Sequence, residues 1–94
     1  MIRTIEYTKK FKRDYKREKN GRYASLLDEE LLKATALLVA DKKLPERYCD
    51  HPLKGEWSDH RDCHLKPDLV LIYAKPNKLT LQLVRIGSHS ELSL

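Results

Sequence analysis

The histidines of this chain are concentrated in its second half. All four, together with Arg61 and Arg85, lie between Asp50 and His89. An imidazole can take up or release a proton near neutral pH because its unperturbed pKa is about 6.5, and an arginine can stabilise negative charge that builds on a phosphate. Cleavage of single-stranded RNA without a metal needs a base for the 2′-hydroxyl, an acid for the leaving 5′-oxygen and such a cation. The residue types therefore permit this chemistry.

Strand parity separates the side chains around His64. On a predicted strand, Asp62 and His64 project from one face and Cys63 from the other, so we expect Cys63 to be a small core residue. Further along, Gly87 permits a sharp turn that can bring His89 back toward the edge of the sheet. The pattern predicts that side chains distant in the sequence converge at one end of a sheet.

A metal site is the alternative use of these residues, because Cys49 stands near His51 and Cys63 precedes His64. The spacing argues against zinc: the chain has no C-x-x-C, and its H-x3-H pair, His60 and His64, falls on a predicted strand and not on a helix. We therefore predict neither a metal nor another cofactor. His60 has no organising neighbour in the sequence and is predicted to be an ordinary surface residue.

The first half of the chain predicts one strand and two helices. Polar and apolar residues alternate briefly over residues 3–7, as in a short strand. Thr8 can cap a helix over residues 9–20, in which Phe11 and Tyr15 are the apolar anchors.

The second helix is predicted to start at the stretch from Ser25 to Asp28, which resembles a capping box, and to end near Ala40. Its core-facing stripe is Leu27, Leu31, Ala34 and Leu38.

The second half of the chain predicts an antiparallel sheet. Period-two stretches occur over residues 57–65 and 79–86, and a continuous apolar run over residues 69–74 is typical of a central strand. We interpret Trp57 as a packing residue. The order of elements predicts an α+β fold in a single domain, residues 1–94, with both helices on one sheet face. On the last strand, alternation places four side chains in phase: Leu79, Leu81, Leu83 and Arg85.

The positive charge is uneven. The formal net charge is +5, and the residues up to Pro45 hold 12 Lys and Arg against 7 Asp and Glu, whereas the remainder holds 7 of each. Residues 9–22 contain eight basic and two acidic side chains. Such a segment is either a solvated helix face or a surface that follows a phosphate backbone, and it would also attract an acidic protein.

The cysteines and the N-terminal segment bear on location. Two cysteines are too few for a disulfide-stapled secreted domain. The first residues carry charge where a leader would be apolar, and no stretch is long enough to span a membrane. We expect a cytoplasmic protein with reduced thiols and no membrane partner.

Four stretches in the second half of the chain carry a family resemblance. The stretches Asp50–Trp57, Arg61–Asp68, Leu71–Tyr73 and Arg85–His89 together resemble the YafQ branch of the RelE/ParE toxin superfamily. The likeness covers nearly the whole chain, but the N-terminal half is similar in pattern only. The resemblance implies a RelE-like fold and a ribosome-dependent messenger-RNA endonuclease, the toxin of a type II toxin-antitoxin pair, which cuts message in the ribosomal A site.

The resemblance also implies roles for particular residues. The family's catalytic positions match His51, His64, Asp68 and His89, and Arg85 matches a phosphate-stabilising arginine. We expect His64 or His51 to be the base and His89 the acid. The implied partners are a DinJ/RelB-like antitoxin and the ribosome with its rRNA and mRNA. The basic residues expected to contact RNA are Lys9, Lys10, Lys12, Arg13, Lys16, Arg17 and Lys54.

Two departures from the family pattern affect substrate contacts. Relatives often carry aromatic residues where this chain has Leu69 and Ser93, so base stacking can differ here. Two other functions stay open: a gyrase inhibitor like the ParE toxins, and an inactive RNA-binding module. Neither explains why the histidines, Asp68 and Arg85 should fit a single site.

Overall fold

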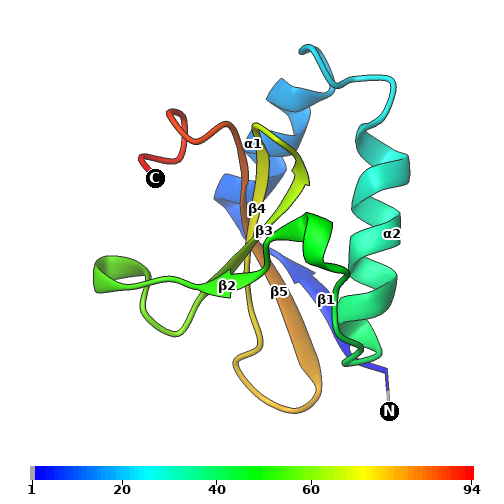
Figure 1. Cartoon of the computed structure of the whole chain (residues 1–94), viewed down its shortest axis with the longest axis vertical. Helices are drawn as coiled ribbons and strands as arrows, with labels where there is room; N and C mark the ends of the chain where they lie inside the picture. Colours follow the sequence, from blue (N-terminus) through cyan, green and yellow to red (C-terminus); the bar gives the residue numbers. More distant parts are fainter. Residues whose placement is uncertain (1) are drawn as a thin grey trace.

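A computed structural model describes residues 2–94 and shows one mixed sheet with two helices (Figure 1). The strand order is β1-β5-β4-β3-β2, in which β1 pairs with β5 in parallel and the other neighbours are antiparallel. This arrangement confirms the predicted α+β, RelE-like fold. The elements are β1 (Thr4–Tyr7), α1 (Lys9–Glu18), α2 (Leu27–Val39), two 3-10 turns η1 (Glu46–Tyr48) and η2 (Gly55–Trp57), β2 (His51–Pro52), β3 (Arg61–Lys66), β4 (Leu69–Ala74) and β5 (Thr80–Gly87).

The start of α1 follows the prediction. The Thr8 hydroxyl accepts a hydrogen bond from the Phe11 amide at 3.0 Å and donates one to the Val84 carbonyl at 2.7 Å. It therefore satisfies a free amide of the helix and ties the helix to β5.

The predicted capping box of α2 is wrong. The helix begins after Leu26, whose side chain makes no capping bond, and the Asp28 carboxylate instead accepts hydrogen bonds from Lys19 and Tyr15. Asp28 therefore links the two helices, and this tertiary contact replaces the local one.

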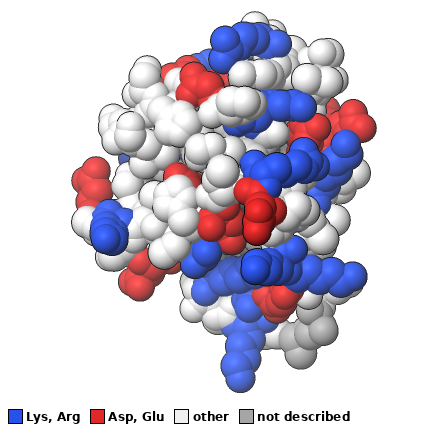
Figure 2. Space-filling model, in the orientation of Figure 1, with Lys and Arg blue, Asp and Glu red and all other residues white. Residues whose placement is uncertain are grey.

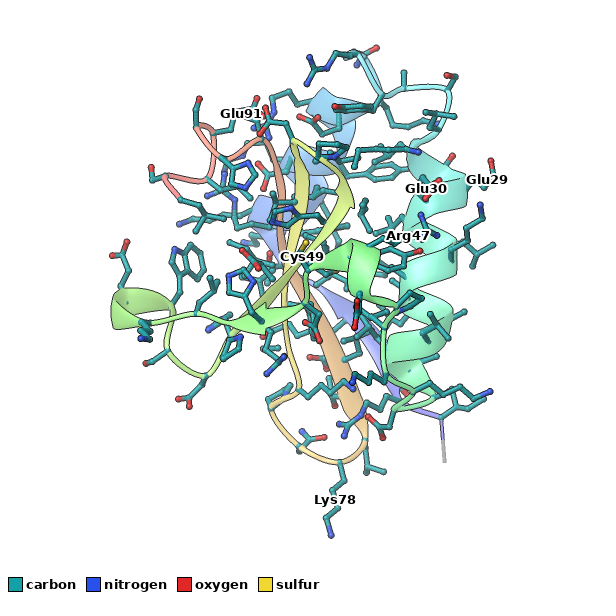
Figure 3. All side chains as sticks on the ribbon, in the orientation of Figure 1. Glu29, Glu30, Arg47, Cys49, Lys78 and Glu91 are labelled. Atoms are coloured by element: carbon teal, nitrogen blue, oxygen red, sulfur yellow. The ribbon has the colours of Figure 1, made fainter. Side chains whose placement is uncertain are left out.

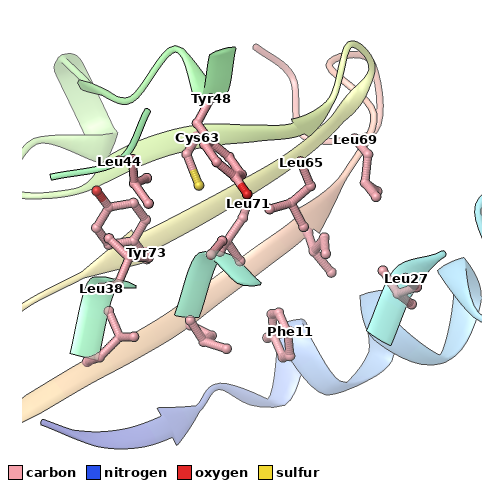
Figure 4. Close-up of a cluster of buried hydrophobic side chains, with 14 residues drawn as sticks. Phe11, Leu27, Leu38, Leu44, Tyr48, Cys63, Leu65, Leu69, Leu71 and Tyr73 are labelled. Carbon is pink, nitrogen blue, oxygen red and sulfur yellow. The ribbon is translucent and has the colours of Figure 1, made fainter. Parts of the chain in front are cut away.

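The sheet has apolar side chains on both faces. The helix-side core joins Phe11 of α1 and Leu27 of α2 to Leu71 of β4 (Figure 4). The opposite face carries a smaller cluster formed by Val70, Ile72 and Leu92, with Leu53, Trp57 and Val84 packed against it. All six residues of β4 are buried, which confirms it as the central strand. The packing role predicted for Trp57 is also confirmed.

The last strand breaks the predicted alternation. Ile72 pairs with Arg85, whereas the next residue, Tyr73, pairs with Leu83, so β5 contains a bulge at Val84. A bulge adds one residue to one strand and changes which face the following side chains occupy. Leu81, Leu83 and Ile86 therefore enter the helix-side core while Arg85 does not, and Leu79 is 58% exposed. The prediction that these positions remain in phase was wrong.

The strand predicted from Trp57 begins later. Residues Gly55–Trp57 form the 3-10 turn η2, and Asp59 has a left-handed backbone with a φ of 69°. Strand β3 starts at Arg61. Within residues 2–94, no helix is long and apolar enough to cross a membrane.

Candidate active site

The predicted site residues meet on the sheet face that the helices leave uncovered. His51, Asp62, Ile72 and Arg85 are successive cross-strand partners from β2 to β5. Directly paired residues project from the same face of a sheet, and Ile72 belongs to the cluster on this uncovered face. His64 lies two residues after Asp62 on β3 and shares its face. The sheet therefore presents these side chains together.

His89 comes to the same face from the other end of the chain. The C-terminal turn lies beside the turn between β3 and β4 (Figure 1), and Asp68 in that turn holds His89 in place. The Asp68 Oδ1 atom accepts the His89 amide at 3.0 Å and lies 2.7 Å from Nδ1 of the ring. These two hydrogen bonds, from the backbone and then the side chain of His89, lower the pKa of Asp68. A carboxylate that accepts from Nδ1 orients the ring and leaves Nε2 free for a substrate.

His64 and His89 are direct neighbours. Their ring centroids are 5.0 Å apart, and the two planes are inclined at 78°. Both side chains are partly exposed, so a substrate can reach them. The structure thus brings together a pair of histidines 25 positions apart in the sequence, with an aspartate fixing one of them.

Asp62 is a site residue that the sequence prediction did not include. Its side chain is only 4% exposed, and its Oδ1 lies 3.0 Å from Nδ1 of His51. His51 Nδ1 is closer, at 2.8 Å, to the Cys49 carbonyl, and among residues 2–94 Asp62 Oδ1 has no aligned hydrogen bond. Burial raises the pKa of Asp62, and the nearby His51, His64 and His89 oppose that shift. The parity of β3 had already placed Asp62 on the correct face.

The tautomer of His51 follows from its hydrogen bond. A carbonyl oxygen can only accept, so the contact with Cys49 requires a proton on Nδ1. In the neutral ring, Nε2 then carries the lone pair. His51 is exposed, and this nitrogen is available as a base.

Arg85 has a partner that sequence reasoning missed. Its Nε and Nη2 atoms lie 2.5 and 3.1 Å from the two carboxylate oxygens of Asp14 on α1. Asp14 is 2% exposed. The only sequence signal was that Asp14 is one of two acidic residues in a basic helix, and its partner lies 71 positions away.

Other predicted residues lie elsewhere on the molecule. His60 packs against Trp57 and bonds the Ser58 carbonyl. Cys63 is fully buried in the helix-side core, as parity predicted. Leu69 is also fully buried there, so it cannot stack on a substrate base, whereas Ser93 is exposed.

The basic residues predicted to contact RNA are all exposed. The face in Figure 2 carries Lys and Arg side chains in separate groups with acidic side chains between them. Arg17 differs from the other predicted RNA-contacting residues because it forms ion pairs with Asp14, Glu18 and Glu91. The exposed set comprises Lys9, Lys10, Lys12, Arg13, Lys16, Arg17 and Lys54.

A five-stranded mixed sheet with both helices on one face and a histidine–aspartate cluster on the other is the arrangement expected of the RelE-like class of small toxins. Residues 3–94 match the family model described as "Bacterial toxin of type II toxin-antitoxin system, YafQ". The chain belongs to this YafQ toxin family.

Its relatives agree with this placement. The mRNA interferase toxin YafQ of Escherichia coli K12 is 38% identical over 90 residues, which are 96% of this chain and 95% of that protein. The crystal structure of the E. coli DinJ-YafQ complex matches with a TM-score of 0.79 and 37% identity, covering 96% and 97% of the two chains. A metal-bound toxin from Helicobacter pylori matches with a TM-score of 0.81 and 50% identity over 98% and 99%.

Proposed function

We propose that this protein is an endoribonuclease that cleaves messenger RNA in the ribosomal A site, as the toxin of a toxin-antitoxin pair. The observation that carries the proposal is the pairing of His64 with a His89 ring held by Asp68, on the face that also presents His51 and Arg85. The E. coli relative is named an mRNA interferase toxin.

The geometry supports a division of labour between the histidines. His51, with its proton on Nδ1, offers Nε2 as the base that takes the 2′-hydroxyl proton. His89, held through Nδ1 by Asp68, acts as the acid in its protonated imidazolium form: it gives the Nε2 proton to the leaving 5′-oxygen as the P–O5′ bond breaks and keeps the Nδ1 proton on Asp68. His64 stands against His89 and is the alternative base. Arg85 faces the charge that develops on the phosphate.

The ribosome would align the RNA strand with the site. A shallow face does not align an RNA strand by itself, and alignment contributes about 7 to 11 kcal/mol to such a step, whereas an acid or a base contributes about 100-fold to 10,000-fold each. We therefore expect weak activity on free RNA. The exposed basic residues of α1 would follow ribosomal RNA, and the cytoplasm is where the substrate is found.

The reaction is proposed to need no metal. Within residues 2–94, no three His, Cys, Asp or Glu side chains are arranged to hold an ion, and histidines already provide the acid and the base. Because one toxin from H. pylori is metal-bound and a mutant toxin from that organism is copper-bound, the assay includes a chelator arm and an added-copper arm. We expect the cleavage rate to be the same in both, and loss of cleavage on chelation would overturn metal independence.

The antitoxin partner is proposed by analogy with the E. coli DinJ-YafQ complex. An acidic segment would cover the basic surface of α1 or the histidine face. Co-expression with a DinJ-like antitoxin should give a stable complex without cleavage activity.

The deciding experiment adds the purified protein to an actively translating extract and maps the ends of the message. His64→Ala and His89→Ala are expected to reduce cleavage at least about 100-fold, and His60→Ala is the matched control because its ring contacts Trp57 instead. Absence of A-site cuts together with blocked gyrase supercoiling would favour the gyrase alternative. Normal cleavage by both site variants would refute the histidine mechanism.

A further inference from the structure

The outer edge of β5 changes partner halfway along the strand. Strand β1 pairs with β5 only as far as Tyr7 opposite Leu83, and the remaining backbone groups need other partners. Helix α1 supplies them with side chains. The Asp14 Oδ2 atom accepts the Ile86 amide at 3.2 Å, and Arg17 Nη2 donates to the Ile86 carbonyl at 3.1 Å. Two residues of one helix thus replace a neighbouring strand.

Each carboxylate oxygen of Asp14 accepts two hydrogen bonds. Besides the Ile86 amide, the carboxylate accepts Nε and Nη2 of Arg85 and Nη1 of Arg17 at 3.1 Å. The bidentate hydrogen bonding of Asp14 to Arg85 occupies two of the five N–H groups of the guanidinium and fixes the plane of that group. Three N–H groups remain for a phosphate, on a side chain that is 19% exposed.

Arg17 extends the contact to the C-terminal turn. Its Nε lies 2.9 Å from a carboxylate oxygen of Glu91, which Figure 3 shows at the C-terminal turn. A Cβ at Gly87 would come within 2.7 Å of Arg17 Nη2, so the guanidinium of Arg17 lies directly over this glycine. Ser88 and Glu91 cap each other's amides at 2.9 and 3.1 Å. His89 lies inside this turn.

We propose that Asp14 is a positioning residue for the cleavage reaction: through its bonds to Arg85 and Arg17, it fixes the phosphate-binding guanidinium and the turn that carries His89. The proposal rests on the proposed function. Asp14 is buried behind Arg85 and does not touch substrate. The alternative is that the Asp14 carboxylate only neutralises the charge of Arg85 and so weakens phosphate binding. In that case, removal of the carboxylate would raise the cleavage rate.

The test is a double-mutant cycle in the translating extract, with Asp14→Asn, Arg85→Gln and their combination. Asp14→Asn is expected to lower kcat about 10- to 100-fold, with KM for the ribosome changed less than about threefold. In the Arg85→Gln background, the same change should cost less than about threefold, since residues that act through each other are not additive. Glu29→Gln, an exposed carboxylate of α2, is the matched control.

A measurement independent of activity separates this proposal from the function it rests on. The Arg85 Nε–H resonance in ¹⁵N NMR spectra should exchange slowly with water in the wild type and rapidly in Asp14→Asn. If wild-type protein does not cut message, the proposed function fails and the resonance still tests the Asp14 contact.

A second variant keeps the proposal testable if the first does not fold. If Asp14→Asn is unfolded by circular dichroism, Arg17→Gln tests the outer part of the network at a partly exposed side chain, with an expected loss of about 3- to 10-fold. An unchanged or raised kcat, a fully additive double variant, or an unaltered Arg85 resonance would overturn the proposal.

Discussion

Replacement of the buried Asp62 by asparagine should make the protein more stable and less active. The residue is 3% exposed, and its Oδ1 atom has no aligned hydrogen bond among residues 2–94. A buried polar atom without a partner costs about 1 to 3 kcal/mol, more when it is charged. The three nearby histidines offset part of this cost. We therefore expect Asp62→Asn to add about 1 kcal/mol at neutral pH, which raises Tm by about 4–8 °C in a domain of this size.

The difference in Tm between the wild type and Asp62→Asn should depend on pH. Burial raises the pKa of Asp62, so the folded protein binds this proton more tightly than the unfolded chain does. The wild type then loses stability relative to the variant as pH rises from the ordinary carboxyl range through the raised pKa. The gap in Tm should be small near about pH 4, where the wild-type carboxyl group is increasingly protonated, and should widen toward neutral pH.

Thermal unfolding followed by circular dichroism over this range measures the gap. Glu56→Gln, which removes an exposed carboxylate, should show no such trend. A lower Tm for Asp62→Asn at neutral pH, or a gap that does not change with pH, would refute the reasoning. Cleavage by the same variant should fall about tenfold, because His51 loses the charge beside it. Unchanged cleavage would make Asp62 a structural residue only.

Three further variants test other contacts. Asp68→Asn should reduce cleavage about 10- to 100-fold by releasing the His89 ring, whereas Arg22→Gln, 3.9 Å from Asp68, should change it little; equal effects would contradict the orienting role. Thr8→Ala should cost about 1 to 2 kcal/mol in urea unfolding, because both hydroxyl hydrogen bonds are lost. Leu71→Ala should cost about 2 to 5 kcal/mol by opening a cavity, and the exposed Leu79→Ala far less; similar costs would contradict the assigned core.

The parts of the fold that depend on local signals could be predicted from the sequence. Thr8 caps α1 as expected, and the apolar run over residues 69–74 is the central strand. The errors came from competition with distant contacts. Asp28 does not cap its own helix because it accepts hydrogen bonds from Lys19 and Tyr15. A reciprocal cap forms instead between Ser88 and Glu91, which have the S-x-x-E spacing but were not predicted to form one.

The site was predictable only in part. Family resemblance and turn chemistry placed His64, Asp68 and His89 together, and the structure brings them within contact. Asp14 could not be found, because nothing in a basic helix indicates which strand its one buried acid will meet. The bulge in β5 likewise has no clear sequence signature, although it decides that Arg85 leaves the core face.

The pairing of the first strand with the last has a consequence for how the protein becomes active during synthesis. Thr4 is paired with Thr80, so the sheet closes only after nearly the whole chain exists, and contacts of such long range form late in folding. A nascent chain that has not yet released β5 and the following turn lacks Arg85 and His89. A fragment that ends before β5 therefore cannot close the sheet, and it lacks two of the residues proposed for cleavage.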